Sequence, residues 1–472
     1  MKAVVIGPGR IGCGFVGQLL RASGHEVVFV ARDPAMVDYL NRVGRYAVRL
    51  CLRGQTQEIL VADVRAVPAF EPRRVAEEIA GAGLIATAVG AGNLRAVAPL
   101  IAAGLRKSRG PVNVLAFENS GSAGPCLCDW VAGHLPQGFP LAQHGFSGAL
   151  VSRIVAERCG CPAKDDILCF MGDPFIEFIV DGRALRRPLP AIQGMKVTDQ
   201  YEAWAQRKLY TFNAGHATAA YLSYLKGYRY IHSAIRDPEI RAAVLAAMRE
   251  GQRGLAARYG AEIAGDENTL LEIVPRFENA MVCDAVERVG RDPQRKLGAE
   301  ERLVGAARLA EAAGINPETL GLAMAAALYF FNPNDFSAAK LQRKIQALGP
   351  KRTLSQLSGL APDRALARLV VRHWRQLSNG WQPGNLLLSL TTMLWTTERE
   401  VADRPGNTFP AASAPGQRQK LARMNSRLPR PDPTRSFSPH RETWRKNPGS
   451  PYVDAPGGCA RTGPLTLRRK SL

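Results

Sequence analysis

Few aromatic residues and no long hydrophobic run occur in this sequence, and both shortages narrow the class of protein. Phe, Trp and Tyr make up 7% of the 472 residues, whereas hydrophobic residues of all kinds reach 46%, which is ample for large buried cores. The apolar stretch at 386–395 is too short to span a bilayer and is interrupted by Ser and Thr. The chain opens on an expected strand without a basic, signal-like leader, so we expect no membrane contact and a cytoplasmic location.

Metal-ligand motifs are also missing. The sequence has neither a C-x-x-C pair nor an H-E-x-x-H helix, and its two C-x-C pairs do not provide four ligands at zinc-binding spacing: Cys126 with Cys128, and Cys159 with Cys161. We therefore expect reduced thiols and no metal cofactor.

Positive charge is abundant but unevenly distributed. The formal net charge is +21, and residues 401–472 hold 14 Lys and Arg against 4 Asp and Glu, a net of +10. Eleven of the 32 prolines lie between residues 405 and 464. We interpret residues 381–472 as a Pro/Arg-rich disordered tail. A nucleic-acid-binding arm is the alternative, but aromatic residues are sparse there, which favours a tail without function.

Two folding patterns precede the tail. Residues 1–192 alternate strands and helices, which predicts an α/β Rossmann-type domain with a parallel sheet. Expected strands lie at 2–6, 27–30, 84–89 and 112–117, and 167–171 with 175–180 resemble a late β-hairpin. Residues 193–380 form an expected mostly α-helical domain for substrate binding and catalysis, with 3.6-residue periodicity at 240–257, 299–313, 317–331 and 362–376.

The first expected strand leads into a glycine-rich turn. Its sequence, Gly7-Pro-Gly9-Arg10-Ile11-Gly12, fits G-x-G-x-x-G directly between a strand and a helix. Gly7 permits a tight turn, Gly9 permits backbone approach to a pyrophosphate, and Gly12 permits close packing of the helix on the sheet. The free N–H groups of the helix then favour an anion. We predict a nicotinamide dinucleotide site.

The end of the second strand does not decide between NAD and NADP. An acid there would bind the ribose hydroxyls of NAD, but the position holds Ala31, followed by Arg32. Arg32 fits a 2′-phosphate, although it could equally be a solvated surface arginine. Asp33 before Pro34 fits a helix N-cap.

A second polar pattern lies in the first long helix of the helical domain. At 100° per residue, Asn213 lies about 140° and His216 about 80° from Lys208, so the three side chains share one side of the helix. Burial of such polar groups is costly without a purpose. The alternative is that the three residues have no functional role: the lysine is on the surface, the amide faces the helix, and the histidine is a core residue whose hydrogen bonds are satisfied.

This Lys-x4-Asn-x2-His pattern resembles the signature of the long-chain polyol-specific (mannitol) dehydrogenase family. The resemblance spans roughly residues 1–378 in the family's order. It includes the glycine turn, Thr87-Ala-Val89-Gly90, Glu118-Asn119, residues 207–221, 276–279 and 287–297. It is strongest to the branch that interconverts fructose 6-phosphate and mannitol 1-phosphate.

The resemblance implies a metal-independent hydride transfer. It implies Lys208 as general base, Asn213 and Asn119 as amides that stabilise the alkoxide, His216 as a substrate-orienting residue, and Val89 and Gly90 at the dinucleotide. A lysine acts as a base near neutral pH when burial or nearby cations lower its pKa.

A basic cluster implies a substrate phosphate, since guanidinium groups bind phosphate well. The candidates are Arg276, Arg288, Arg291, Arg295 and Lys296. Acidic residues lie among these cations, so the alternative is that the segment is a charged helix face exposed to solvent, without a phosphate-binding role. Two other functions stay open: a dehydrogenase for an unphosphorylated polyol or sugar acid, and a non-catalytic NAD(P) sensor whose basic tail binds nucleic acid.

Overall fold

The computed structural model describes residues 1–118, 122–156 and 168–378. These residues belong to the first of two compact units, 1–401 and 402–472. The expected tail at 381–472 and the candidate amide Asn119 lie outside the described residues. In the described part, no helix is both long and apolar enough to cross a membrane.

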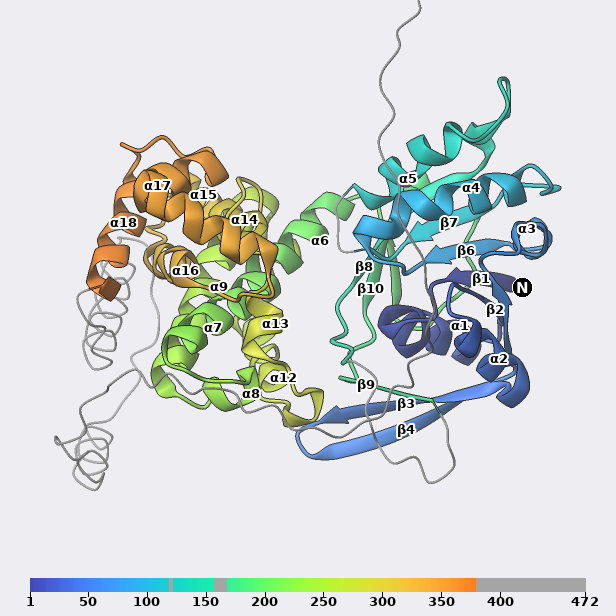
Figure 1. The fold of residues 1–472 in the computed structure, drawn as a ribbon, viewed down its shortest axis with the longest axis horizontal. Coiled ribbons are helices and arrows are strands. Elements are labelled where there is room, and N and C mark those ends of the chain that lie inside the picture. Colours follow the sequence, from blue (N-terminus) through green and yellow to red (C-terminus); the bar gives the residue numbers. More distant parts are fainter. Residues whose placement is uncertain (119–121, 157–167, 379–472) are drawn as a thin grey trace, which may run out of the picture. The chain divides into compact units, whose positions relative to one another are not determined.

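An eight-stranded sheet forms the N-terminal domain, in the order β11-β10-β8-β7-β6-β1-β2-β5 (Figure 1). Every neighbouring pair is parallel except β8 and β10, which are antiparallel. The chain order reverses beside β1, between β2 and β6, where open α/β sheets bind ligands at the carboxyl ends of their strands. The expected Rossmann-type domain is therefore confirmed. The sheet strands are β1 (Lys2–Ile6), β2 (Glu26–Ala31), β5 (Val64–Pro68), β6 (Leu84–Thr87), β7 (Asn113–Ala116), β8 (Gly145–Val151), β10 (Phe178–Asp181) and β11 (Met195–Thr198).

Side chains alternate between two cores on opposite faces of this sheet. Ala3 and Val5 belong to one core together with Leu19 of α1, whereas Val4 and Ile6 belong to the other. The buried strands are apolar on both faces because helices cover both. The helices of this domain are α1 (Gln18–Ala22), α2 (Pro34–Val43), α3 (Pro72–Ala80), α4 (Leu94–Leu105) and α5 (Ala123–Ala132).

A separate three-stranded sheet corrects one expectation. β3 (Arg45–Leu52) and β4 (Gln55–Ala62) form a hairpin, and β9 (Cys169–Gly172) pairs in parallel with β3. The hairpin expected from 167–171 and 175–180 is therefore wrong, because β10 joins the other sheet. Phe170 of β9 packs edge-on against Tyr46 of β3, with ring centroids 5.9 Å apart, and this tertiary contact favours the distant partner.

Helices make up the second domain, as expected, and surround one large core. The central helix α9 (Pro238–Tyr259) is capped by Asp237, whose carboxylate accepts hydrogen bonds from the backbone of Glu239 and Ile240. The others are α6 (Tyr201–Lys208), α7 (Ala214–Leu225), α8 (Ile231–Ala234), α10 (Ala261–Ala264), α11 (Glu267–Leu271), α12 (Val274–Phe277), α13 (Val286–Gly290), α14 (Pro293–Lys296), α15 (Val304–Ala312), α16 (Glu318–Tyr329), α17 (Phe336–Ser358) and α18 (Ala365–Ser378).

Candidate active site

The glycine-rich turn has the geometry of a dinucleotide cradle. Gly7 has φ of +99°, a left-handed conformation that favours glycine. A Cβ on Gly12 would lie 1.9 Å from the carbonyl oxygen of Gly7, so this position admits no side chain. A Cβ on Gly9 would meet nothing within 4 Å, which leaves space beside the turn. The helix that includes Arg10 and Ile11 begins here, so the residues fit a bound pyrophosphate.

The residues at the end of β2 are compatible with either NAD or NADP. Ala31 is buried, Arg32 is exposed, and the Asp33 carboxylate accepts a 3.0 Å hydrogen bond from the backbone of Ala35. Asp33 is therefore the N-cap of α2, as the sequence indicated.

A buried carboxyl group supports the turn that follows β6. Glu118, 5% exposed, accepts hydrogen bonds from Thr87 Oγ1 at 2.7 Å and from the backbone N–H of Val89 at 3.0 Å. Burial raises the pKa of Glu118. Next to Val89, Gly90 has φ of +85°. Sequence reasoning assigned no role to Glu118, although a Glu directly after a buried strand was a usable signal.

Lys208 ends α6 and reaches the carboxyl end of β8. Its Nζ donates a 2.5 Å hydrogen bond to the carbonyl oxygen of Val151, the last residue of that strand. β8 lies three strands from β1, or about 14 Å at ordinary strand spacing, and the carboxyl ends of these parallel strands share one edge. Burial, with the nearby cations Arg276 and Arg302, lowers the pKa of Lys208 to about 8.

The helix carrying Lys208, Asn213 and His216 is not a regular α-helix. Residues Leu209–Asn213 form a π-helical turn between α6 and α7. The offsets expected at 100° per residue are therefore wrong, because a turn with i→i+5 hydrogen bonds winds more slowly. Lys208 lies before the turn, Asn213 at its end, and His216 beyond it in α7. Such inserted turns are frequent at functional sites.

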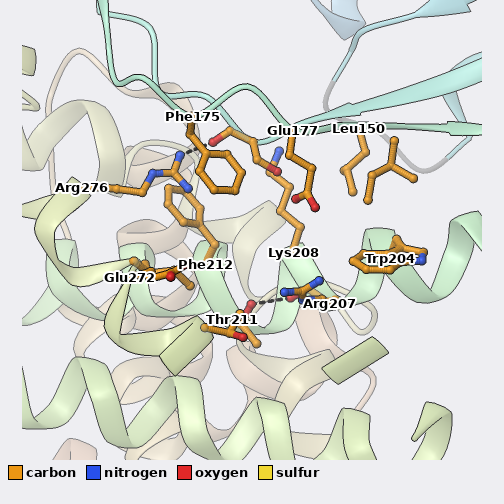
Figure 2. Close-up of a pocket in the computed structure, with 14 residues that line it drawn as sticks. Leu150, Phe175, Glu177, Trp204, Arg207, Lys208, Thr211, Phe212, Glu272 and Arg276 are labelled. Carbon is orange, nitrogen blue, oxygen red and sulfur yellow. Dashed lines mark hydrogen bonds between the residues drawn. The ribbon is translucent and has the colours of Figure 1, made fainter. Parts of the chain in front are cut away.

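Lys208 lines a pocket of about 230 Å³ between the two domains (Figure 2). The lining combines charged, hydroxyl and aromatic groups. They are Leu150, Ser152, Phe175, Glu177, Ile179, Trp204, Arg207, Lys208, Thr211, Phe212, Thr269, Glu272, Ile273 and Arg276. Of the predicted site residues, this pocket brings together Lys208 and Arg276. Sequence reasoning missed Glu177, Glu272 and Trp204, which lie on three separate segments without a shared motif.

Arg276 is held rigidly in the wall of this pocket. Its Nε donates a 2.7 Å hydrogen bond to Asp173, and its Nη2 donates to the carbonyl oxygen of Ser152. Its guanidinium carbon lies 4.6 Å and 4.5 Å from the ring centroids of Phe175 and Phe212, one ring from each domain. The side chain is therefore preorganised by charge and by aromatic packing.

His216 belongs to an adjoining cluster. Its Nε2 lies 2.9 Å from Asp284 Oδ2, and its ring stacks on Phe277 with centroids 4.8 Å apart. Arg288 Nε donates to the other carboxylate oxygen of Asp284 at 2.8 Å. Burial raises the pKa of Asp284, but the contacts with His216 and Arg288 outweigh this effect, so its pKa lies below the usual value.

The other predicted phosphate ligands do not line the pocket. Lys296 is buried and donates to the backbone carbonyls of Val289 and Arg291. Arg295 pairs with Asp292 and Glu301, and Arg291 is exposed. Of the five candidate phosphate ligands, Arg276 alone is among the residues that line the pocket.

Comparisons with known proteins identify both domains. Residues 1–194 match the mannitol dehydrogenase Rossmann domain, and residues 200–378 match the mannitol dehydrogenase C-terminal domain. A mannitol-1-phosphate 5-dehydrogenase of Brevibacillus brevis is 37% identical over 384 residues, 80% of this chain and 98% of that protein. The enzyme of the same name from Geobacillus stearothermophilus is 36% identical over 386 residues, 80% of this chain and 100% of that protein.

The chain belongs to the mannitol dehydrogenase family. The resemblance seen in the sequence is confirmed, and the protein is an oxidoreductase that acts on CH–OH groups with a nicotinamide dinucleotide.

Solved structures of similar fold include other polyol dehydrogenases. Pseudomonas fluorescens mannitol 2-dehydrogenase, in a ternary complex with NAD and D-mannitol, aligns with a TM-score of 0.66 at 17% identity, over 84% of this chain and 94% of that one. A substrate-free D-sorbitol dehydrogenase aligns with a TM-score of 0.66 at 15% identity, over 80% of this chain and 93% of that one. At these identities the likeness concerns the fold of this mannitol dehydrogenase family member.

Within residues 1–118, 122–156 and 168–378, no group of three His, Cys, Asp or Glu side chains is placed to hold a metal ion. Cys126 and Cys128 are free thiols, and the pair Cys159–Cys161 lies outside those ranges.

Proposed function

We propose that this mannitol dehydrogenase family member reversibly reduces fructose 6-phosphate to mannitol 1-phosphate with NADH or NADPH. The observation that carries the proposal is the meeting of Lys208 and Arg276 in one pocket beside the carboxyl edge of the sheet. The match to this chain covers nearly the full length of the two relatives described above, and their names support this substrate.

Lys208 would move the proton that accompanies hydride transfer. The nicotinamide, when bound, supplies a hydride to C2 of the ketose or accepts it from the polyol. In polyol oxidation the neutral amine of Lys208 takes the hydroxyl proton, and in ketose reduction its ammonium returns that proton to the carbonyl oxygen. A pKa of about 8 leaves both forms populated near neutral pH.

Amide groups would stabilise the charge that develops on the reacting oxygen. Asn213, 8% exposed at the end of the π-helical turn, is one proposed donor, and Asn119 is the other. His216, held by Asp284 and stacked on Phe277, would orient a substrate hydroxyl. Neutral amide donors around an oxyanion need no metal, so we propose metal-independent catalysis.

Arg276 is the proposed ligand of the substrate phosphate. Its hydrogen-bond partners among the described residues engage Nε and Nη2, which leaves Nη1 to donate to a phosphate oxygen. The dinucleotide would bind across Gly7–Gly12, Arg32, Val89 and Gly90. Since Ala31 replaces the acid expected for NAD and Arg32 follows it, the proposal includes both NAD and NADP.

One observation favours a second substrate class. Glu177 and Glu272 also line the pocket, and their carboxylates would repel a phosphate group. They would instead accept hydrogen bonds from the hydroxyls of an unphosphorylated polyol. A dehydrogenase for a free polyol or sugar acid is therefore the alternative.

Reductase assays separate these substrates. Purified full-length protein is given fructose or fructose 6-phosphate, each with NADH and with NADPH, while absorbance at the reduced nicotinamide band is followed. We expect kcat/KM to be about 10- to 100-fold higher for fructose 6-phosphate, since a charge-assisted phosphate contact contributes about 1.5–3 kcal/mol. Equal values would contradict the phosphate assignment, and preference for fructose would establish the alternative.

A further inference from the structure

Asp173 is the most enclosed charged group near the pocket, yet it is outside the proposed reaction. It follows β9, is 0% exposed, and accepts a 2.7 Å hydrogen bond from Arg276 Nε. Its other oxygen accepts from the backbone N–H of Phe175 at 3.2 Å, and its own N–H donates to the carbonyl oxygen of Ile154. A buried carboxylate with this many partners is fixed in place.

The residues at the end of β8 contact both Lys208 and Arg276, the partner of this carboxylate. We call Val151–Arg153 the β8 exit segment. The carbonyl oxygen of Val151 accepts from Lys208, and that of Ser152 accepts from Arg276. The two cations from the helical domain thus bind consecutive carbonyl groups of the dinucleotide-binding domain.

Arg153 extends the same segment to the dinucleotide-binding helix. Its Nη1 donates to the carbonyl oxygen of Gly14 at 3.0 Å and to Gln18 Oε1 at 2.8 Å, and its Nε donates to the carbonyl oxygen of Phe175. The side chain is only 5% exposed. Burial lowers the pKa of Arg153 to about 10, and the charge of Asp173, which also pairs with Arg276, opposes that shift.

We infer that Asp173 is a positioning residue, which holds Arg276 against the β8 exit segment so that its free Nη1 faces the substrate pocket. Without the carboxylate, the Arg276 guanidinium has no ionic partner at Nε and turns away from Ser152. Arg276, and not Asp173, contacts the substrate. The inference rests on the proposed function in so far as Arg276 binds substrate.

A double-mutant cycle tests whether Asp173 acts through Arg276. The variants are Asp173→Asn, Arg276→Met and the double variant, and each KM for fructose 6-phosphate is compared with its kcat. Each single variant should raise KM by about tenfold or more, with a smaller change in kcat, and the double variant should match Arg276→Met. An unchanged KM in Asp173→Asn, or effects that multiply in the double variant, would overturn the inference.

A matched control separates positioning from stability. Asp237→Asn removes a carboxylate that pairs with Lys226 at 2.7 Å, outside the residues that line the pocket. It should lower the melting temperature without altering KM. If Asp173→Asn does not fold because Arg276 loses its buried partner, the double variant, which also removes the charge of Arg276, is compared directly with Arg276→Met.

Hydrogen–deuterium exchange supplies a readout that does not depend on turnover. In Asp173→Asn, peptides covering Val151–Arg153 should exchange several-fold faster than in the wild-type protein, whereas Asp237→Asn should leave them unchanged. Unaltered exchange in Asp173→Asn would refute the positioning role. If wild-type protein does not turn over fructose 6-phosphate, the proposed function fails while exchange still decides the role of Asp173.

Discussion

Lys208 donates a 2.5 Å hydrogen bond from Nζ to the carbonyl oxygen of Val151, at the point where β8 ends. A neutral amine that donates to this carbonyl keeps its lone pair free for another partner. The contact therefore orients the lone pair of the proposed base while it fixes the amine at the sheet edge where parallel α/β folds bind their ligands.

Replacing Lys208 with Ala should abolish proton transfer and spare the dinucleotide site. We expect kcat to fall roughly 100- to 10,000-fold, the range for loss of a general base. The dissociation constant for NADH or NADPH, measured by fluorescence, should change less than about twofold. Lys226→Ala is the control, since Lys226 pairs with Asp237 and Glu239 and does not line the pocket. Retained turnover in Lys208→Ala would remove Lys208 from the base role.

The pH dependence should follow the lowered pKa of Lys208, about 8. In polyol oxidation the neutral amine is the active form, so kcat/KM should rise with pH and level off above about 8. In ketose reduction the ammonium is active, so kcat/KM should fall above the same pH. A profile without an ionisation between pH 7 and 9, in both directions, would contradict the assignment.

Removing the neighbouring cation should shift that profile. The Arg276 guanidinium lowers the pKa of Lys208, so Arg276→Met should raise the pKa of Lys208 and move the midpoint of the oxidation profile to higher pH. Profiles recorded for wild type and variant at saturating dinucleotide measure the shift. A midpoint that stays in place or falls would show that Arg276 does not lower the pKa of Lys208.

Two glycines of the turn should respond differently to Ala. In Gly12→Ala the new Cβ meets the carbonyl oxygen of Gly7 at 1.9 Å, so we expect a stability loss of about 1–3 kcal/mol or more, seen as a lower melting temperature. In Gly9→Ala the Cβ enters open space, so stability should stay unchanged. Dinucleotide affinity should nevertheless fall about tenfold or more, about 1.4 kcal/mol. Full affinity in Gly9→Ala would exclude close approach of the pyrophosphate.

Arg32 is the test of cofactor choice. Arg32→Asp replaces an exposed cation after β2 with an acid, so kcat/KM with NADPH should fall more than kcat/KM with NADH. The ratio of the two values, measured on the same preparation, is the readout. An unchanged ratio would make Arg32 an ordinary surface residue.

Much of the site was predictable where the signal is local. The glycine turn was recognisable because a strand, a tight turn and a helix N-terminus follow one another directly in the chain. Lys208 was recognisable through family resemblance. The relative positions of Lys208, Asn213 and His216 along the helix could not be predicted, because no sequence pattern marks the π-helical turn at Leu209–Asn213. Which of the five candidate cations line the pocket was also not predictable, because counting cations does not reveal that Lys296 is buried against backbone carbonyls.

The sequence alone determined the order of the domains and the dinucleotide turn, since each depends on residues close together in the chain, and its family resemblance pointed to the proposed base. The tertiary structure decided the partners of the distant segments. It paired β9 with β3, and it placed Asp173 and Arg276, 103 positions apart, in one buried ion pair beside Lys208. Such pairings depend on which buried charges and apolar faces satisfy one another after the chain folds, and no local pattern records that outcome.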